Sequence, residues 1–363
     1  MNLKHACAAA VVLLLAPTAR AQEPTDRLPQ WLAAVKAHEP GNPGKAALDV
    51  AQWPGVELEE VILEARRYAR ALDKTRQDEA NALLLRGAVL HADIARLIPD
   101  DMERRSPKQQ RIFIVSDGRE QGTRFVSLHW ELGRSLVDAM APAPATYPGA
   151  LKWYQETAKD LLWLRSLAEA SVHLPKARRI FPADPALLFM SGVLHERFSS
   201  ASLQAAAQSV LVENRGSTAL NSARAELTRA ERFFRETLAI EPHHREARVR
   251  HGRVLGELGR HAQSADVLRG AIEEGATGEF LYLAELFLGR QEDAMGNRAR
   301  ARACFERAAS LYPRAQSPRL ALSQLSRRTG DRPGAQRELR VLADLPADER
   351  QREDPWWNYY NVR

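Results

Sequence analysis

Histidine and carboxylate side chains gather at one point of the sequence, at His243, His244, Glu246 and His251. Imidazole and carboxylate groups are ligands that zinc accepts, and His244 and His251, seven residues apart, can share one helix face. His243 and His244, however, follow a proline in a position typical of a polar turn. The sequence also has no H-E-x-x-H motif and no paired C-x-x-C motif. We therefore predict no metal site and no other cofactor.

Cys304 and pairs of adjacent acids are the other candidates for chemistry. Cys304 lies in a predicted helix, and nothing close in the sequence would lower the pKa of its thiol, so we expect it to pack rather than react. Adjacent acids, such as Asp100 with Asp101 and Glu273 with Glu274, point to different sides of a helix and do not form an acid and base couple. The sequence has no G-x-S-x-G, S-x-x-K or glycine-rich phosphate loop. We predict that the protein is not an enzyme.

Aromatic residues cluster in the middle of the chain, at Trp130, Trp153, Tyr154 and Trp163. The preferred interpretation is that they fill a core between helices, and a binding surface is the alternative.

A second aromatic cluster, of Trp356, Trp357, Tyr359 and Tyr360, lies within the last eight residues. Four exposed aromatic side chains would promote aggregation, so they need a partner. The segment can be a cap that folds back over the apolar face of the last hairpin, because terminal repeats require capping. It can also be a peptide that docks into a groove on another protein. The cap is the preferred interpretation.

Residues 1–21 have the pattern of a cleavable signal peptide. Lys4 is followed by an uncharged apolar stretch, and Ala19, Arg20 and Ala21 form an A-x-A cleavage site before Gln22. We expect export, with the bacterial periplasm as the location. Cys7 precedes the apolar stretch, so we expect neither a lipid anchor nor a disulfide in the mature chain.

The composition is that of a globular protein, with 363 residues, 45% hydrophobic and 27% charged. The formal charge is +6, and removal of the predicted signal peptide leaves 50 basic and 46 acidic residues, a charge of +4. Arginine and glutamate are interspersed over most of the chain, which is typical of solvated helix faces rather than of a nucleic-acid site. No second apolar run is long enough to span a membrane, so we expect neither nucleic acid nor a membrane span.

Apolar residues at spacings of three and four predict helices from residue 56 to about 345. Residues 22–55 contain five prolines and three glycines, and we expect a linker with short helices there. Residues 111–126 have two β-branched and aromatic runs around a polar turn. They predict either a small β-hairpin or an irregular loop between helices.

Small residues recur at a regular spacing in the last third of the chain. Gly259, Gly296 and Gly330 are 37 and 34 residues apart, and each lies five residues before a small residue: Ser264, Ala301 and Ala335. One unit continues as Ala301, Phe305, Ala308 and Pro313, and an earlier unit has the similar series Ala230, Phe234, Thr237 and Pro242. Gly192 and Gly252 fall where paired helices must approach closely.

This series resembles the tetratricopeptide repeat family, whose 34-residue helical hairpin carries small residues, phenylalanine, alanine and proline in its second helix. The resemblance implies an all-α, right-handed solenoid of helical hairpins. We expect clear repeats in residues 223–345, degenerate repeats with insertions in residues 56–222, and an aromatic tail in residues 346–363.

The resemblance also implies a concave groove that binds a peptide or protein, read by residues of the first helix of each hairpin. By position these are Glu246, Val249, Arg253, Leu320, Gln324 and Arg327. The arginines suit a carboxylate ligand, although a solvated helix face is the alternative for each residue.

We therefore predict a non-enzymatic periplasmic scaffold or adaptor with a protein partner in the cell envelope. Two other functions remain open. One is an exported enzyme, or an accessory subunit of one, that acts on an envelope polymer through carboxylates facing each other across the groove. The other is a structural subunit that self-associates, with the tail of one copy in the groove of the next.

Overall fold

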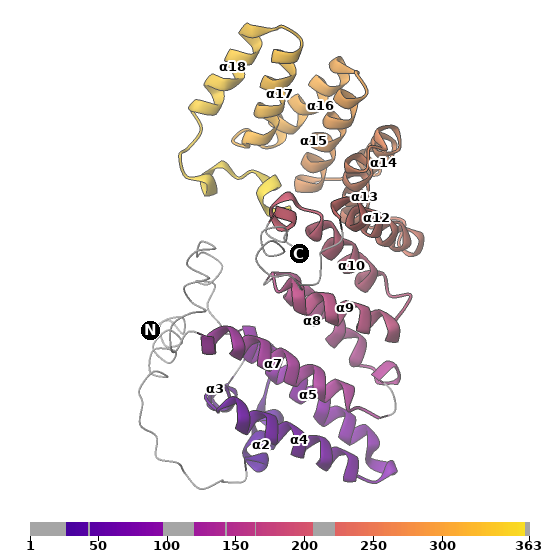
Figure 1. The fold of residues 1–363 in the computed structure, drawn as a ribbon, viewed down its shortest axis with the longest axis vertical. Helices are drawn as coiled ribbons and strands as arrows, with labels where there is room; N and C mark the ends of the chain where they lie inside the picture. Colours follow the sequence, from indigo (N-terminus) through magenta and orange to yellow (C-terminus); the bar gives the residue numbers. More distant parts are fainter. Residues whose placement is uncertain are drawn as a thin grey trace. The chain divides into compact units, whose positions relative to one another are not determined.

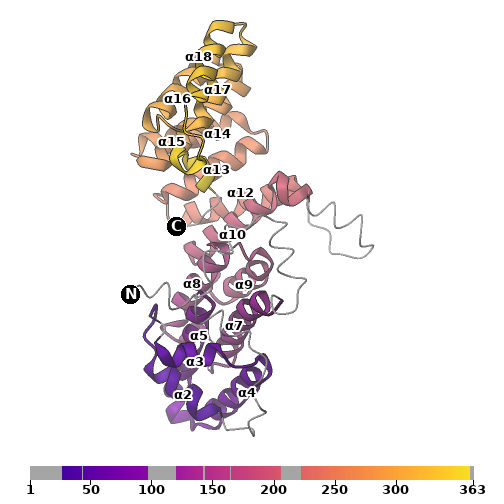
Figure 2. The same cartoon turned by 90° about the vertical axis from the view of Figure 1, so that its left-hand side faces the viewer.

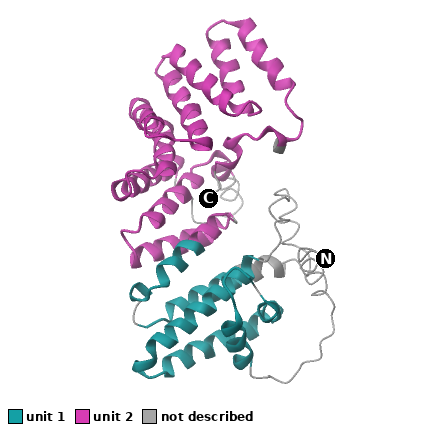
Figure 3. Cartoon of the chain, turned by 180° about the vertical axis from the view of Figure 1, so that it is seen from behind, with its two compact units in different colours: residues 1–157 teal, residues 158–363 magenta. Residues whose placement is uncertain are grey.

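The computed structural model describes residues 27–42, 44–96, 120–141, 144–163, 165–205 and 222–359. The chain divides into two compact units, Met1–Thr157 and Ala158–Arg363 (Figure 3). The predicted signal peptide, including Cys7, lies outside the described residues. Among the helices that are described, none has both the length and the apolar character that a membrane crossing requires.

Helices make up the secondary structure of the described residues, apart from one isolated β-bridge between Glu39 and Asn42. The predicted all-α fold class is confirmed. The alternative of a β-hairpin at residues 111–126 is wrong for its second half, because residues 120–126 belong to the helix Glu120–Asp138. If residues 120–126 paired with a second strand, the helix would lose the backbone hydrogen bonds of its first turns. The helix itself packs against the helix Gln77–Arg96. Residues 111–119 lie outside the described part.

The described part of unit 1 begins at residue 27, within the segment that we expected to be a linker, residues 22–55. The predicted short helices are present, but they pack into the unit, with Trp31, Val35 and Val50 buried. Two of the prolines do not prevent this packing because they lie at helix starts, where no backbone donor is lost. Pro29 is in the first turn of the helix Leu28–Ala37, and Pro54 is the N-cap of the helix Gly55–Ala71. The helices of unit 1 are α2 (Leu28–Ala37), α3 (Lys45–Ala51), α4 (Gly55–Ala71), η1 (Lys74–Arg76), α5 (Gln77–Arg96), α7 (Glu120–Asp138), η3 (Pro144–Thr146) and the first part of α8 (Ala150–Trp163).

Unit 2 is a series of helical hairpins that follows α9 (Leu167–Ile180), and each hairpin packs on the next (Figure 1). The first helices are α10 (Pro185–Phe198), α13 (Arg245–Glu257), α15 (Gly278–Ala294) and α17 (Gln316–Arg328). Their partners are α12 (Ala223–Ile240), α14 (His261–Glu273), α16 (Arg298–Leu311) and α18 (Arg332–Ala343). α15 has 17 residues, whereas α13 and α17 have 13 each, which explains the longer spacing of 37 in the sequence.

In three of the hairpins the two helices touch at a glycine, at the predicted Gly192 and Gly252 and also at Gly289. A Cβ atom added at Gly192 would lie 2.5 Å from the ring of Phe234, and one added at Gly289 would lie 2.5 Å from the ring of Phe305. Gly252 meets Leu268 in the same way. The close approach predicted at Gly192 and Gly252 is therefore confirmed.

Candidate functional site

The candidate site is the surface of unit 2 on which the C-terminal segment of the chain lies. After α18 the chain forms two 3-10 turns, η4 (Glu349–Arg352) and η5 (Pro355–Asn358). It then crosses the first helices of the hairpins, from the start of α17 over α15 to α13 and α10. Figure 1 and Figure 2 both show this last segment, in yellow, returning from α18 to α15 and α13. We call residues 354–359 the tail segment, and the surface of the first helices that contacts it the tail-binding face.

The first anchor of the tail segment is the carboxylate of Asp354, which is 2% exposed. Its Oδ1 accepts a hydrogen bond from the hydroxyl of Tyr282 at 2.7 Å, and its Oδ2 accepts one from the backbone N–H of Ser317 at 2.9 Å. Ser317 lies in the first turn of α17, whose own N-cap residue makes no side-chain bond. Asp354 therefore satisfies a helix N-terminus that attracts negative charge. Burial, and then the nearby carboxylate, raise the pKa of Tyr282, which keeps it a donor.

The second anchor is Trp356, which packs against an aromatic and cationic surface. Its ring meets Phe287 of α15 edge-on, with 5.7 Å between centroids, and stacks on Tyr359 at 5.3 Å. The guanidinium groups of Arg253 and Arg290 lie 5.3 and 5.6 Å from the centre of the indole. Such cation–π contacts favour an aromatic side chain at this place over an aliphatic one.

The third and deepest anchor is Tyr359, which is 4% exposed. Its hydroxyl donates to Glu196 Oε1 at 2.5 Å, and its backbone carbonyl accepts from Arg250 Nη2 at 2.5 Å. Glu196 is fully buried and also binds Arg250 at 2.8 Å and Arg253 at 2.7 Å. The arginines thus neutralise a buried carboxylate that also accepts a hydrogen bond from the phenol.

Burial and neighbouring charges shift the pKa values of Tyr359 and Arg250 in this cluster. Burial, followed by the charge of Glu196, raises the pKa of Tyr359 well above its usual value. Burial alone would lower the pKa of Arg250, but Glu246, Tyr359 and Glu196 together raise it. Arg250 therefore stays charged and Tyr359 stays a neutral phenol in the physiological pH range. Beside it, a cavity of about 20 Å³ remains, which is room for about one water molecule.

The tail folds back, but its described contacts with the last hairpin are at the start of α17 rather than over an apolar face as the cap interpretation expected. Leu339 of α18 in that hairpin stays 49% exposed, while the tail segment lies on α10, α13 and α15. The reason is chemical: the tail carries a carboxylate and a phenol, which find charged and polar partners on the first helices and none on an apolar face. Trp357 lies over Arg352 within the tail itself, at 6.0 Å, and Tyr360 lies outside the described residues.

The structure separates the six groove residues expected from the resemblance into two sets. Glu246, Val249 and Arg253 lie beside the tail segment, and Glu246 holds the Nε of Arg250 at 2.8 Å. Leu320, Gln324 and Arg327 are exposed on α17, where no tail residue contacts them among the described interactions. They share the helix face of Gln316, which receives a bond from Arg352, so this face continues the tail-binding face.

Sequence reasoning missed most of the residues that hold the tail: Glu196, Arg250, Tyr282, Phe287, Arg290 and Asp354. Glu196 and Arg250 are 54 positions apart, and Tyr359 lies 163 positions from Glu196. Only Asp354 carried a local signal, since an aspartate before proline is typical of a helix start.

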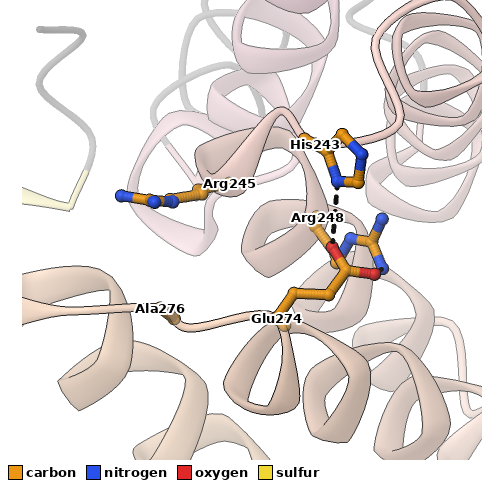
Figure 4. A pocket seen from close by; sticks show the side chains of 6 residues that line it. His243, Arg245, Arg248, Glu274 and Ala276 are labelled. Atoms are coloured by element: carbon orange, nitrogen blue, oxygen red, sulfur yellow. Dashed lines mark hydrogen bonds and ion pairs between the residues drawn. The ribbon is translucent and has the colours of Figure 1, made fainter.

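The histidine cluster does not converge on a point. His243 is exposed and lies 3.7 Å from Glu274, His244 caps α13 through Ala247 N–H at 3.2 Å, and His251 lies 3.5 Å from Glu231. Figure 4 shows His243, Arg248 and Glu274 around a cavity of about 190 Å³ in which Glu274 also binds Arg248 at 2.5 Å. Within the described part of the chain, no group of three or more histidine, cysteine or acidic residues is placed to hold a metal ion.

The remaining candidates for chemistry are packing residues. Cys304 is 3% exposed, and burial raises the pKa of its thiol to about 12. Trp130, Trp153 and Tyr154 are buried, as the core interpretation expects, whereas Trp163 is 44% exposed.

No protein-family model matches the chain, and no curated protein matches its sequence. Among solved structures it is similar to PilF of Pseudomonas aeruginosa, with 18% identity over 56% of this chain and 79% of that chain and a TM-score of 0.42. It is also similar to yeast Tom70 (14% identity, 97% and 68%, TM-score 0.38) and to Cut9–Hcn1 of the APC/C (13% identity, 98% and 73%, TM-score 0.31). Similarity at this level assigns neither a family nor a partner to this chain.

Proposed function

We propose that this protein is an exported, periplasmic scaffold that binds a protein or peptide on the tail-binding face and catalyses no reaction. The observation that supports it is the tail segment itself, which is held on the first helices by side-chain anchors as a peptide ligand would be. The exposed residues Leu320, Gln324 and Arg327 of α17 extend the same surface beyond the tail segment. The buried carboxylate on this face, Glu196, is bound to two arginines, so it is not arranged as a free acid or base.

The proposal is tested with the full chain as bait in extract of the cell envelope, followed by mass spectrometry. Arg290→Glu reverses an exposed charge of the tail-binding face, and Arg327→Glu does so on α17. Arg300→Glu on α16, outside this face, is the matched control. We expect the first two variants to lose at least five-fold in capture of the same partner while both stay folded and the control captures as the wild type does. Equal capture by all variants would contradict the proposal.

Arg253 is unsuitable for this test although it lies on the face. It is 9% exposed and bound to Glu196, so Arg253→Glu would place two carboxylates together in a buried site and destabilise the unit.

Export is tested separately. We expect the protein isolated from the envelope fraction to begin at Gln22, because Ala19 and Ala21 form the cleavage site. N-terminal sequencing and intact mass measure this, and a full-length chain in the cytoplasmic fraction would contradict it.

A further inference from the structure

The tail segment uses three side chains with a fixed spacing to hold the tail-binding face. Asp354, Trp356 and Tyr359 stand at positions i, i+2 and i+5, and each meets a different chemistry. The carboxylate meets an N–H and a phenol, the indole meets an aromatic ring and two guanidinium groups, and the phenol meets a buried carboxylate. Asn358 between them is exposed.

The groups that hold these three anchors belong to the helices, and several of them also bind one another. Glu196, Arg250 and Arg253 bind one another across α10 and α13, and Glu246 fixes Arg250 from the preceding turn. The N–H groups at the start of α17 point outward by the geometry of any helix. The face therefore offers the same acceptors and donors to any segment of this chemistry.

The described residues after α18, in contrast, contain no α-helix. The segment after α18 consists of two 3-10 turns of four residues each, so it can leave the face without breaking a hairpin. While it is bound, the cavity of about 20 Å³ leaves no room for a second segment at the deep anchor. Occupation by the tail and by a partner therefore exclude each other there.

We infer that the partner carries an acidic and aromatic segment, a carboxylate followed two and five residues later by an indole and a phenol, and that the tail competes with it in cis. This inference rests on the proposed function and gives it a ligand class and a means of regulation. A tethered competitor works at an effective concentration on the order of millimolar, so only a segment that matches all three sites displaces it.

The direct test is the binding of a fluorescein-labelled peptide of residues 349–363 to the full chain, followed by fluorescence anisotropy. The tail-null chain carries Asp354→Asn, Trp356→Ala and Tyr359→Ala, which remove the anchors and leave the face intact. The matched control carries Trp357→Ala and Asn358→Ala. We expect the peptide to bind the tail-null chain at least ten-fold more tightly than the wild-type or control chain. A peptide with the three anchor substitutions should not bind.

Further variants and measurements separate the outcomes. Arg290→Glu in the tail-null chain should weaken peptide binding at least three-fold, because one cation over the indole is lost. A folded tail-null chain that does not bind the peptide would overturn the inference. So would a tail-null chain that unfolds and is not restored by excess peptide, because the tail would then be a structural part of the unit.

Self-association is a third outcome. If the wild-type chain forms dimers and the tail-null chain does not, the tail of one copy binds the tail-binding face of another. That result would overturn the assignment of this face to a different protein. Failure of this inference can be distinguished from failure of the proposed function. If the peptide does not bind but Arg290→Glu still abolishes capture from envelope extract, the scaffold function is supported and only the proposed ligand class is wrong. If the peptide binds but no partner depends on the face, the scaffold fails.

Discussion

At the scale of single residues, charged groups that are fully buried decide how the tail lies. Glu196 has no exposed surface, and it is stable there because two guanidinium groups and one phenol donate to it. Tyr359 is the one donor of the three that belongs to the tail. The strength of the tail contact therefore depends on this hydroxyl more than on the exposed aromatic area.

Tyr359→Phe removes that hydroxyl and leaves the ring in place. A hydrogen bond to a charged group contributes about 1.5–3 kcal/mol, so we expect the free energy of unfolding of the full chain to fall by roughly that amount. Urea denaturation measures it, with Tyr68→Phe as the control because Tyr68 is 40% exposed on α4. Equal stability of wild type and Tyr359→Phe would mean that the phenol is not bound to Glu196.

Unit 1 contains a buried chain of three rings that is sensitive to protons. Trp31 donates to His91 Nε2 at 3.1 Å, so His91 carries its proton on Nδ1 and donates it to His129 Nδ1 at 2.8 Å. Burial lowers the pKa of His129 to about 3. Burial, and then His129, lower the pKa of His91 well below its usual value. Protonation of either acceptor nitrogen would break a bond of the chain.

Because both pKa values are lower in the folded than in the unfolded state, their contribution to stability is complete above about pH 6.5. It is lost as the pH falls from there toward 3, and His129 alone loses about 2 kcal/mol between pH 6.5 and 5. We expect faster hydrogen exchange in α5 at pH 5 than at pH 7, after correction for intrinsic rates. In His129→Leu the same change of pH should have a smaller effect. Exchange in wild-type α5 that does not change with pH would contradict this.

At the scale of elements, contacts within one hairpin were predictable and contacts between distant elements were not. The spacing of Gly192, Gly252 and the alanines follows from two helices that must touch, which is a local constraint. The packing of residues 22–55 was missed because the helix-breaking prolines and glycines were counted without regard to their positions. Pro29 and Pro54 lie at helix starts, where proline does not disrupt the helix. The path of the tail segment depends on partners that lie 37 to 163 positions away in the sequence.

Gly289→Ala tests the close contact between α15 and α16. The added Cβ would lie 2.5 Å from Phe305, so we expect a loss of about 1–3 kcal/mol in the free energy of unfolding. Gly270→Ala in α14 is the matched control, because its Cβ would meet Arg248 only at 3.6 Å. There the better helix propensity of alanine should raise the stability by roughly 0.5–1 kcal/mol. Chemical denaturation of both variants measures this, and equal signs for the two substitutions would contradict the packing.

At the scale of the whole molecule, the class of the fold could be predicted but its occupied surface could not. Helical periodicity and the small-residue series led to hairpins, and half of the expected groove residues, Glu246, Val249 and Arg253, lie on the tail-binding face. The other half, Leu320, Gln324 and Arg327 on α17, is exposed. That the chain places its own carboxylate, indole and phenol on this face follows only from three-dimensional proximity.

The central claim is that the tail-binding face holds either the tail or a partner. It is tested most directly by capture of the partner from envelope extract with the wild-type chain, in the presence of increasing free peptide of residues 349–363. We predict that the peptide abolishes capture, and that the same peptide with Asp354, Trp356 and Tyr359 replaced has no effect. Capture that persists at saturating peptide would show that the partner binds elsewhere and would contradict the account.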